Sequence, residues 1–264
     1  MTIGKNTGTE VDRGKGTRRP LPGPGFFALM LLVVAVIAGV GGFLLGWGKG
    51  SSAPGRAQLP VFGRAPRYDL INQLGQKVNS RSFKGKIQIV TVLDPYCSDF
   101  CPLIAVNLAN FAAKLHASGL DRKVVFVVFN VNPWETGAAD MRVFLRQYGW
   151  DPKTRGLQYL TGSVAEIQRV VQQGFHVAFE RVPRRRDSQG AVSGTPGHLE
   201  LALPNPLAER AKPRYDIIHN DTIEIVDGKG RIRKIFDQGT RVSDQRLMEA
   251  ILALMPAAGS VSGR

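Results

Sequence analysis

Residues 87–115 read IQIVTVLDPYCSDFCPLIAVNLANFAAKL, and this stretch combines three different patterns. Its first seven residues are apolar and β-branched, which predicts a buried strand. Apolar residues at helical spacing follow over 102–115, and Pro102 stands at a favourable first position of a helix. Cys97 and Cys101, the only two cysteines in 264 residues, lie in the turn between them. The stretch therefore predicts a strand–turn–helix unit whose helix start favours thiolate over thiol.

Strands and helices continue to alternate after this unit. The sequence predicts a buried strand over 123–130, a helix over 140–148, a short strand over 157–160 and a helix over 163–173. Ser163 and Glu166 at the start of that last helix match a capping box. Two strands over 217–226 and 231–236 then flank the hairpin turn Asp227-Gly228-Lys229-Gly230, and a helix over 243–254 follows. This order is typical of a thioredoxin-like α/β domain.

The N-terminal part has a different organisation. Residues 1–25 are polar and rich in Gly and Pro, which predicts a disordered segment. Residues 26–47 (FFALMLLVVAVIAGVGGFLLGW) carry no charge and are long enough to span a bilayer as a helix. A cleaved signal peptide is the alternative, but its apolar region would be shorter, which favours an uncleaved transmembrane anchor. Residues 48–60 then form a linker, 61–256 the domain and 257–264 a tail.

One stretch of the domain, about 181–214, fits no element of this pattern. It is rich in proline, contains three consecutive arginines at 184–186, and reads as a long insertion. We consider three interpretations: a basic docking surface for a partner, a passive insertion, or a loop that folds over and supplies His198 as a metal ligand.

The formal net charge of the chain is +14. Basic residues stand on both sides of the apolar span, so the charge rule for membrane proteins does not settle the orientation. A surplus of this size favours solubility and attraction to anionic lipid head groups. No recognition-helix or RNA-binding signature accompanies it, which argues against a nucleic-acid partner.

The cysteine pair has two chemical interpretations beyond a structural disulfide, which would close a very small loop and stabilise little. Disulfide exchange on a thioredoxin-like fold uses two intervening residues, whereas three separate Cys97 from Cys101. Two thiolates suit Cu(I) best among biological metals, with a third ligand completing the site. Zinc would require four ligands, and the chain offers no further cysteine.

Histidine is the expected third ligand, and the chain has four. His116 falls within the helix after the cysteines and is predicted to lie on the surface. His176, His198 and His219 remain as candidates. His219 is favoured on geometry, because the segment entering the hairpin strand passes beside the cysteine turn in thioredoxin-like folds.

Further motifs complete a resemblance that covers most of 60–255. They are Pro66, Leu70 and Gly75, Phe83-Lys84-Gly85-Lys86, Cys97-Ser98-Asp99-Phe100-Cys101-Pro102, Val131-Asn132-Pro133, Leu160-Thr161-Gly162, Tyr215 with His219, and Asp227-Gly228-Lys229-Gly230. On these motifs the chain resembles the SCO/SenC family of copper proteins for cytochrome oxidase assembly.

The resemblance implies a membrane-tethered thioredoxin-like domain facing the periplasm, or the mitochondrial intermembrane space as the alternative. It implies that Cys97, Cys101 and His219 bind Cu(I) or Cu(II). The implied client is the copper A site of oxidase subunit II or a related copper protein, served by copper delivery, by reduction of the client's cysteines, or by both. It therefore favours a metallochaperone over an enzyme, with Cys97 and Cys101 redox-active if reduction is the role.

The chain departs from the family pattern around the cysteines. Asp94-Pro95-Tyr96 replaces the usual aromatic-Thr pair, Asn132 replaces an acidic residue, and Ile218 replaces the common Asp before the histidine. A thiol–disulfide oxidoreductase without a copper role remains the alternative function. A peroxidase of the peroxiredoxin type would need a Thr-rich approach to the cysteine and a nearby arginine, and neither is present in the sequence.

Overall fold

A computed structural model describes residues 59–183, 204–211 and 214–255, all within one compact unit, Arg56–Arg264. The expected disordered segment, transmembrane anchor, most of the linker, the tail and His198 lie outside these residues. Within the described part of the chain, no helix has the length and apolarity needed to cross a membrane.

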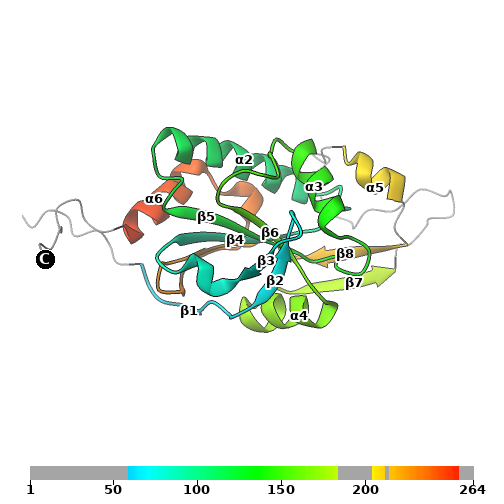
Figure 1. Ribbon diagram of the computed structural model, residues 1–264, viewed down its shortest axis with the longest axis horizontal. Helices are drawn as coiled ribbons and strands as arrows, with labels where there is room; N and C mark the ends of the chain where they lie inside the picture. Colours follow the sequence, from blue (N-terminus) through cyan, green and yellow to red (C-terminus); the bar gives the residue numbers. More distant parts are fainter. Residues whose placement is uncertain (1–58, 184–203, 212–213, 256–264) are drawn as a thin grey trace, which may run out of the picture. The chain divides into compact units, whose positions relative to one another are not determined.

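The described residues form an eight-stranded sheet in the order β1-β10-β9-β4-β5-β6-β2-β3 (Figure 1). Its strands are β1 Gly63–Arg64, β2 Asp69–Asn72, β3 Lys77–Asn79, β4 Ile87–Leu93, β5 Val124–Asn130, β6 Leu157–Thr161, β9 Ile223–Val226 and β10 Arg231–Phe236. The central strands β4, β5 and β6 are parallel, and the outer strands pair antiparallel to their neighbours. The predicted thioredoxin-like arrangement of alternating strands and helices is therefore confirmed.

Helices cover both faces of this sheet (Figure 1). One face carries α2 Cys101–Ala117, α3 Ala138–Gln147 and α6 Asp244–Leu254, and the other carries α4 Val164–Gln168, which continues into the π-helical turn η2 Arg169–Gly174. Short 3-10 turns η1 Ser80–Phe83 and η3 Gly239–Arg241 complete the unit. The sheet is thus the middle layer of three.

The central strands are apolar on both faces because both faces are covered. Every residue of β4 and β5 is buried. Along β4, Ile89 and Leu93 pack into the core beneath α2, whereas Val90 and Val92 pack into the core beneath α4. The continuous apolar run that predicted this strand follows from burial on two sides.

Helix starts also follow the sequence signals. Ser163 accepts a hydrogen bond from the Glu166 amide at 3.3 Å, and Glu166 accepts one from the Ser163 amide at 3.0 Å. The predicted capping box is therefore confirmed. Ser243 caps α6 in the same way through the Arg246 amide.

The predicted strand over 217–226 is wrong as a single element. The segment forms two strands in two sheets: β8 Tyr215–His219 pairs with β7 Phe179–Pro183 in a small separate sheet, and β9 belongs to the main sheet. The break occurs at Asp221, whose carbonyl accepts from the Gly239 amide and whose carboxylate accepts from the Thr240 amide and hydroxyl. These bonds turn the chain out of one sheet and into the other.

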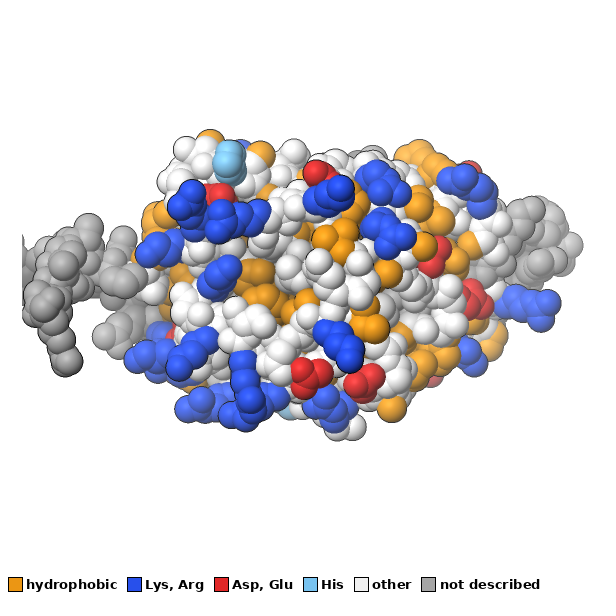
Figure 2. Space-filling view, viewed as in Figure 1, with side chains coloured by type: hydrophobic (Ala, Val, Ile, Leu, Met, Phe, Trp, Pro, Cys, Tyr) orange, Lys and Arg blue, Asp and Glu red, His pale blue; other side chains and the backbone are white. Residues whose placement is uncertain are grey.

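The described residues of the insertion belong to elements that the sequence did not predict. Residues 181–183 end β7, and residues 206–211 form the helix α5 Pro206–Ala211. The three consecutive arginines lie outside the described residues. Across the visible face, Lys and Arg side chains are numerous (Figure 2).

Candidate metal centre

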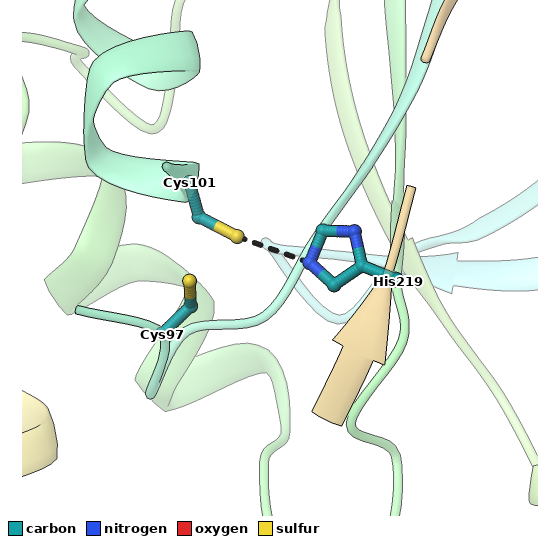
Figure 3. Close-up of side chains that lie close together, drawn as sticks. All are labelled: Cys97, Cys101 and His219. Carbon is teal, nitrogen blue, oxygen red and sulfur yellow. Dashed lines mark hydrogen bonds between the residues drawn. The ribbon is translucent and has the colours of Figure 1, made fainter. Parts of the chain in front are cut away.

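Three side chains from two distant parts of the sequence meet at the carboxyl end of β4 (Figure 3). Cys97 lies in the turn after this strand, Cys101 is the first residue of α2, and His219 is the last residue of β8. Their ligand atoms all lie within 4.8 Å of one another, close enough for one small metal ion to contact all three. Cys101 and His219 are buried and Cys97 is half-buried, so the cluster reaches solvent through Cys97.

The histidine ring is held with one nitrogen toward the thiols. His219 Nδ1 donates to the Asn220 carbonyl at 2.9 Å, and because a carbonyl only accepts, the proton lies on Nδ1. Nε2 then faces Cys101 Sγ at 3.2 Å (Figure 3). Phe100 packs edge-on against the ring, with 4.8 Å between ring centroids. A hydrogen bond on the far nitrogen is the usual device that orients a metal-binding imidazole.

The two thiols differ in acidity. The hydrogen bond from Cys101 and the neighbouring His219 hold the pKa of Cys97 well below its usual value. Burial, and then the charge of Cys97, hold the pKa of Cys101 well above its usual value. Burial lowers the pKa of His219, but its hydrogen bond to Cys97 and the charge of that thiolate outweigh burial, and the net pKa is raised. The pKa of Cys97 thus moves in the direction expected at a helix start, but through its side-chain partners, whereas desolvation dominates at the buried sulfur of Cys101.

A buried acid lies beneath the cysteine turn. Asp94 is 4% exposed, its carbonyl accepts from the Cys97 amide, and its carboxylate accepts from the Tyr96 amide at 2.9 Å and from Asn132 Nδ2 at 3.1 Å. Tyr215 donates in turn to Asn132 Oδ1 at 3.1 Å. Burial, followed by the charge of Cys97, raises the pKa of Asp94 to about 7. Three of the residues that depart from the pattern of the resemblance, Asp94, Tyr96 and Asn132, thus belong to one hydrogen-bonded network beside the cysteine turn, whereas Ile218 is exposed and lies outside it.

The insertion reaches the same turn through one side chain that the sequence analysis missed. Asn205, 1% exposed, donates from Nδ2 to the carbonyls of Pro95 at 2.9 Å and Cys97 at 2.6 Å. Its Oδ1 accepts from the amides of Leu207 and Ala208, so the same residue caps α5. The pair Asn205-Pro206 is a helix-start signal that could have identified it.

Two other histidines, His116 and His176, lie among the described residues and do not join the cluster. The side chain of His116 is 81% exposed and approaches Asp121, as expected for a surface position. His176 is exposed and adopts a left-handed backbone with φ 57°. In the described part of the chain, Cys97, Cys101 and His219 are the members of the group, and no fourth His, Cys, Asp or Glu accompanies them. Two sulfurs and one imidazole fit a three-coordinate copper ion better than tetrahedral zinc.

Comparison with known proteins bears on what such a cluster does. The sequence matches the model of the SCO1/SenC family over residues 60–196. Among curated protein sequences, none matches the chain significantly.

Solved structures share the fold. A SCO1/SenC family lipoprotein from Bacillus anthracis is 18% identical, with a TM-score of 0.54 over 73% of this chain and 95% of that one. ScoI from Bradyrhizobium japonicum, solved with copper bound, is 24% identical, with a TM-score of 0.51 over 72% and 97%. BsSco, a Sco-family cytochrome c oxidase assembly protein with a disulfide switch, is 17% identical, with a TM-score of 0.53 over 75% and 97%.

Proposed function

The chain belongs to the SCO1/SenC family, and from this premise we propose that it is a membrane-anchored copper-binding protein that assists assembly of the copper A site of a respiratory cytochrome oxidase. Its ligands are Cys97, Cys101 and His219, and its ion is Cu(I) or Cu(II). The observation that carries the proposal is the convergence of these three ligand atoms within 4.8 Å of one another, with Cys97 half-buried and the other two buried.

The chemistry of the donors supports copper as the cargo. Cys97 already favours the thiolate form, and Cys101 loses its proton when a metal binds. Two thiolates suit Cu(I), and the imidazole adds the borderline donor that Cu(II) accepts. Cys97 is the least buried of the three ligands, so a client's ligands would approach the ion from its side.

The anchor and the orientation are part of the same proposal. The uncharged span over 26–47 would hold the domain on the extracytoplasmic side, facing the periplasm or, in the alternative, the mitochondrial intermembrane space. Subunit II of the oxidase, or a related copper protein, is the client.

The test is copper binding by the full chain in detergent. We expect one copper per chain, and loss of tight binding in Cys97→Ser and Cys101→Ser, a decrease of about 100-fold or more because one of two strong donors is gone. His219→Ala should weaken Cu(II) more than Cu(I), since two thiolates still hold Cu(I) in linear geometry. His116→Ala is the matched control and should bind as wild type. An unchanged Cu(II) spectrum in His219→Ala would contradict the ligand assignment.

The difference between the two thiols favours a second function, reduction of the client's disulfide. The Cys97 thiolate would attack one client sulfur, forming a mixed disulfide and releasing the other client sulfur as a thiolate, which takes the Cys101 proton. Cys101 then attacks Cys97, which releases the second client thiolate and leaves a Cys97–Cys101 disulfide. The client gains two electrons and this chain loses two. His219→Ala separates the functions, because reductase activity should survive in it while Cu(II) binding falls.

A further inference from the structure

The edge of the sheet opposite the metal centre is basic. We call residues 84–86, 121–123 and 227–231 the basic edge; they lie at the starts of β4, β5 and β10. Main-chain hydrogen bonds join the three segments, from the Gly85 amide to the Gly228 carbonyl and from the Ile87 amide to the Lys123 carbonyl, both at 2.9 Å. They therefore form one continuous surface.

Free cations dominate this surface. Lys84, Arg122, Lys123 and Lys229 are exposed, and in the described part of the chain none of them forms an ion pair. The acids of the basic edge are engaged: Asp227 is buried against Arg231 and Arg233, and Asp121 approaches His116. Figure 2 shows few acidic side chains at the end of the unit where β5 begins in Figure 1, and more of them among the basic ones toward the other end.

The described chain also begins at this end. Arg64 of β1 pairs with Arg231 at the start of β10, and the Ala65 amide donates to the Gly230 carbonyl at 2.9 Å. Figure 1 places the first described residues beside the start of β5 and the end of α6. Eleven residues separate Trp47, the end of the apolar span, from Leu59. Fully extended, they reach at most about 36–40 Å.

We propose that the basic edge lies on the surface of a bilayer that contains anionic lipids, and that it thereby orients the domain; the proposal rests on the proposed anchor. A tether of this reach keeps the domain next to the bilayer, and the cationic surface is at the end where the tether arrives. Clustered Lys and Arg beside a membrane anchor bind anionic head groups, and the attraction decays within a Debye length. The attraction between these cations and the anionic head groups is therefore strongest when the basic edge contacts the lipid.

The orientation has a consequence for the metal centre. The cysteine turn lies beyond the far end of β4, and a strand of seven residues spans about 23 Å. With the basic edge on the lipid, Cys97 and His219 face away from it by about that distance. The copper ion would then be presented at a fixed height to a membrane-bound client.

The test compares the full chain in nanodiscs of phosphatidylcholine with the full chain in nanodiscs of phosphatidylcholine and phosphatidylglycerol, by amide hydrogen exchange. In the anionic discs, peptides covering the basic edge should exchange about fivefold more slowly, while peptides covering 95–102 and 215–220 should not change. Raising the salt to about 1 M should remove the protection, because the Debye length falls to about 3 Å.

Two triple variants with the same change in net charge provide the control. Lys84→Gln/Lys123→Gln/Lys229→Gln should lose the protection, whereas Arg146→Gln/Arg210→Gln/Arg214→Gln, which removes three exposed cations elsewhere, should keep it. Equal exchange in both lipids, protection at the metal centre instead, or the same loss in both variants would each overturn the proposal.

If residues 26–47 do not anchor the chain in the bilayer, the experiment gives a result that differs from failure of lipid binding by the basic edge. A chain without an anchor does not co-elute with the neutral nanodiscs. In that case the same exchange experiment is run with added vesicles of the two lipid compositions. Protection of the basic edge by anionic vesicles alone would uphold lipid binding, and its absence would overturn it.

Discussion

Two aspartates at opposite edges of the sheet are both buried, but their pKa values are shifted in opposite directions. Asp94, at the metal edge, is 4% exposed and has a neutral amide and the Cys97 thiolate as neighbours, and its pKa rises to about 7. Asp227, at the basic edge, is 6% exposed, and although burial opposes the effect, backbone and arginine hydrogen bonds hold its pKa below the usual value. Burial raises the pKa of both carboxyls, and the hydrogen bonds from backbone amides and arginines outweigh it only at Asp227.

The difference shows that buried polar groups have different roles at the two edges of the sheet. At the basic edge the carboxylate stabilises a turn and accepts hydrogen bonds from two backbone amides and two arginines. At the metal edge the carboxyl, the thiols and the imidazole are held close together, and among the described residues no Lys or Arg forms an ion pair with Asp94, an arrangement that favours capture of a metal ion. Substitutions at the two edges should therefore separate stability from copper binding.

Glu224 lies in β9, between the two edges. It extends the comparison because neither an arginine nor an amide accompanies its carboxyl among the described residues. It is 2% exposed, its Oε2 has no hydrogen-bond partner among the described residues, and burial raises its pKa to about 8. A raised folded pKa means that stability is highest below the unfolded pKa of about 4.5 and is lost as the pH rises through about 8.

Glu224→Gln should therefore be more stable than wild type at pH 9, by on the order of 4 kcal/mol, and similar to it at pH 5. Chemical unfolding followed by tryptophan fluorescence at the two pH values measures the difference. Glu249→Gln, at an exposed position of α6, is the control and should leave the pH profile unchanged. Parallel profiles for wild type and Glu224→Gln would show that the side chain finds a partner.

The second prediction concerns Asp227, where the largest loss of stability at neutral pH is expected. Its carboxylate accepts from the amides of Lys229 and Arg231 and from the guanidinium groups of Arg231 and Arg233, at 2.8–3.0 Å. Asp227→Ala should lower the free energy of unfolding by about 3 kcal/mol, because buried charged hydrogen bonds are lost together.

Asp227→Asn is the companion variant, since its oxygen still accepts from the two amides. It should lose about half as much stability as Asp227→Ala at pH 7, and the difference from wild type should shrink as the pH falls below about 3.8 and the aspartate is protonated. Copper affinity should equal that of wild type in both. A loss of copper comparable to that of Cys97→Ser would show that the two edges are not independent.

The parts of the fold set by local signals could be predicted from the sequence. The strand–turn–helix unit around the cysteines, the capping box at Ser163 and the final helix all depend on neighbours within one or two turns. The separation of β8 from β9 was missed, although the polar residues 219–222 (HNDT) interrupt the apolar pattern where the two strands separate. The break depends on bonds from Asp221 to Thr240, 19 residues away.

The residues of the site also divide into those that a local sequence pattern identifies and those that depend on tertiary structure. Cys97 and Cys101 stand out by their spacing alone, whereas His219 could be selected among four histidines only through the expected position of its strand. Asn205 was missed because its helix-start signal lies in a stretch read as an insertion, and its contact with Cys97 joins residues 108 apart in sequence. Which residues support a site from outside it is a property of tertiary structure, which no local pattern contains.

The smallest predicted effect concerns Asn205 and tests whether the metal edge is independent of the insertion. Asn205→Ala removes both the cap of α5 and the two bonds to the cysteine turn. The loss of a helix cap costs about 1 kcal/mol of stability. Because the carbonyl of Cys97 loses its partner, the turn gains freedom, and we expect copper to leave the site about three- to tenfold faster in a chelator-competition experiment.

Asn79→Ala is the matched control for this effect. Asn79 caps η1 by accepting from the Arg81 amide at 2.8 Å, and it lies on β3, an edge strand of the main sheet, whereas β8 belongs to the separate two-stranded sheet. Its loss should lower stability by a similar amount, about 1 kcal/mol, without changing the rate of copper release. If both variants release copper at the same increased rate, the effect belongs to overall stability. If neither does, the bonds from Asn205 do not restrain the turn. Faster release in Asn205→Ala alone would show that the insertion controls exchange of the metal through one buried amide.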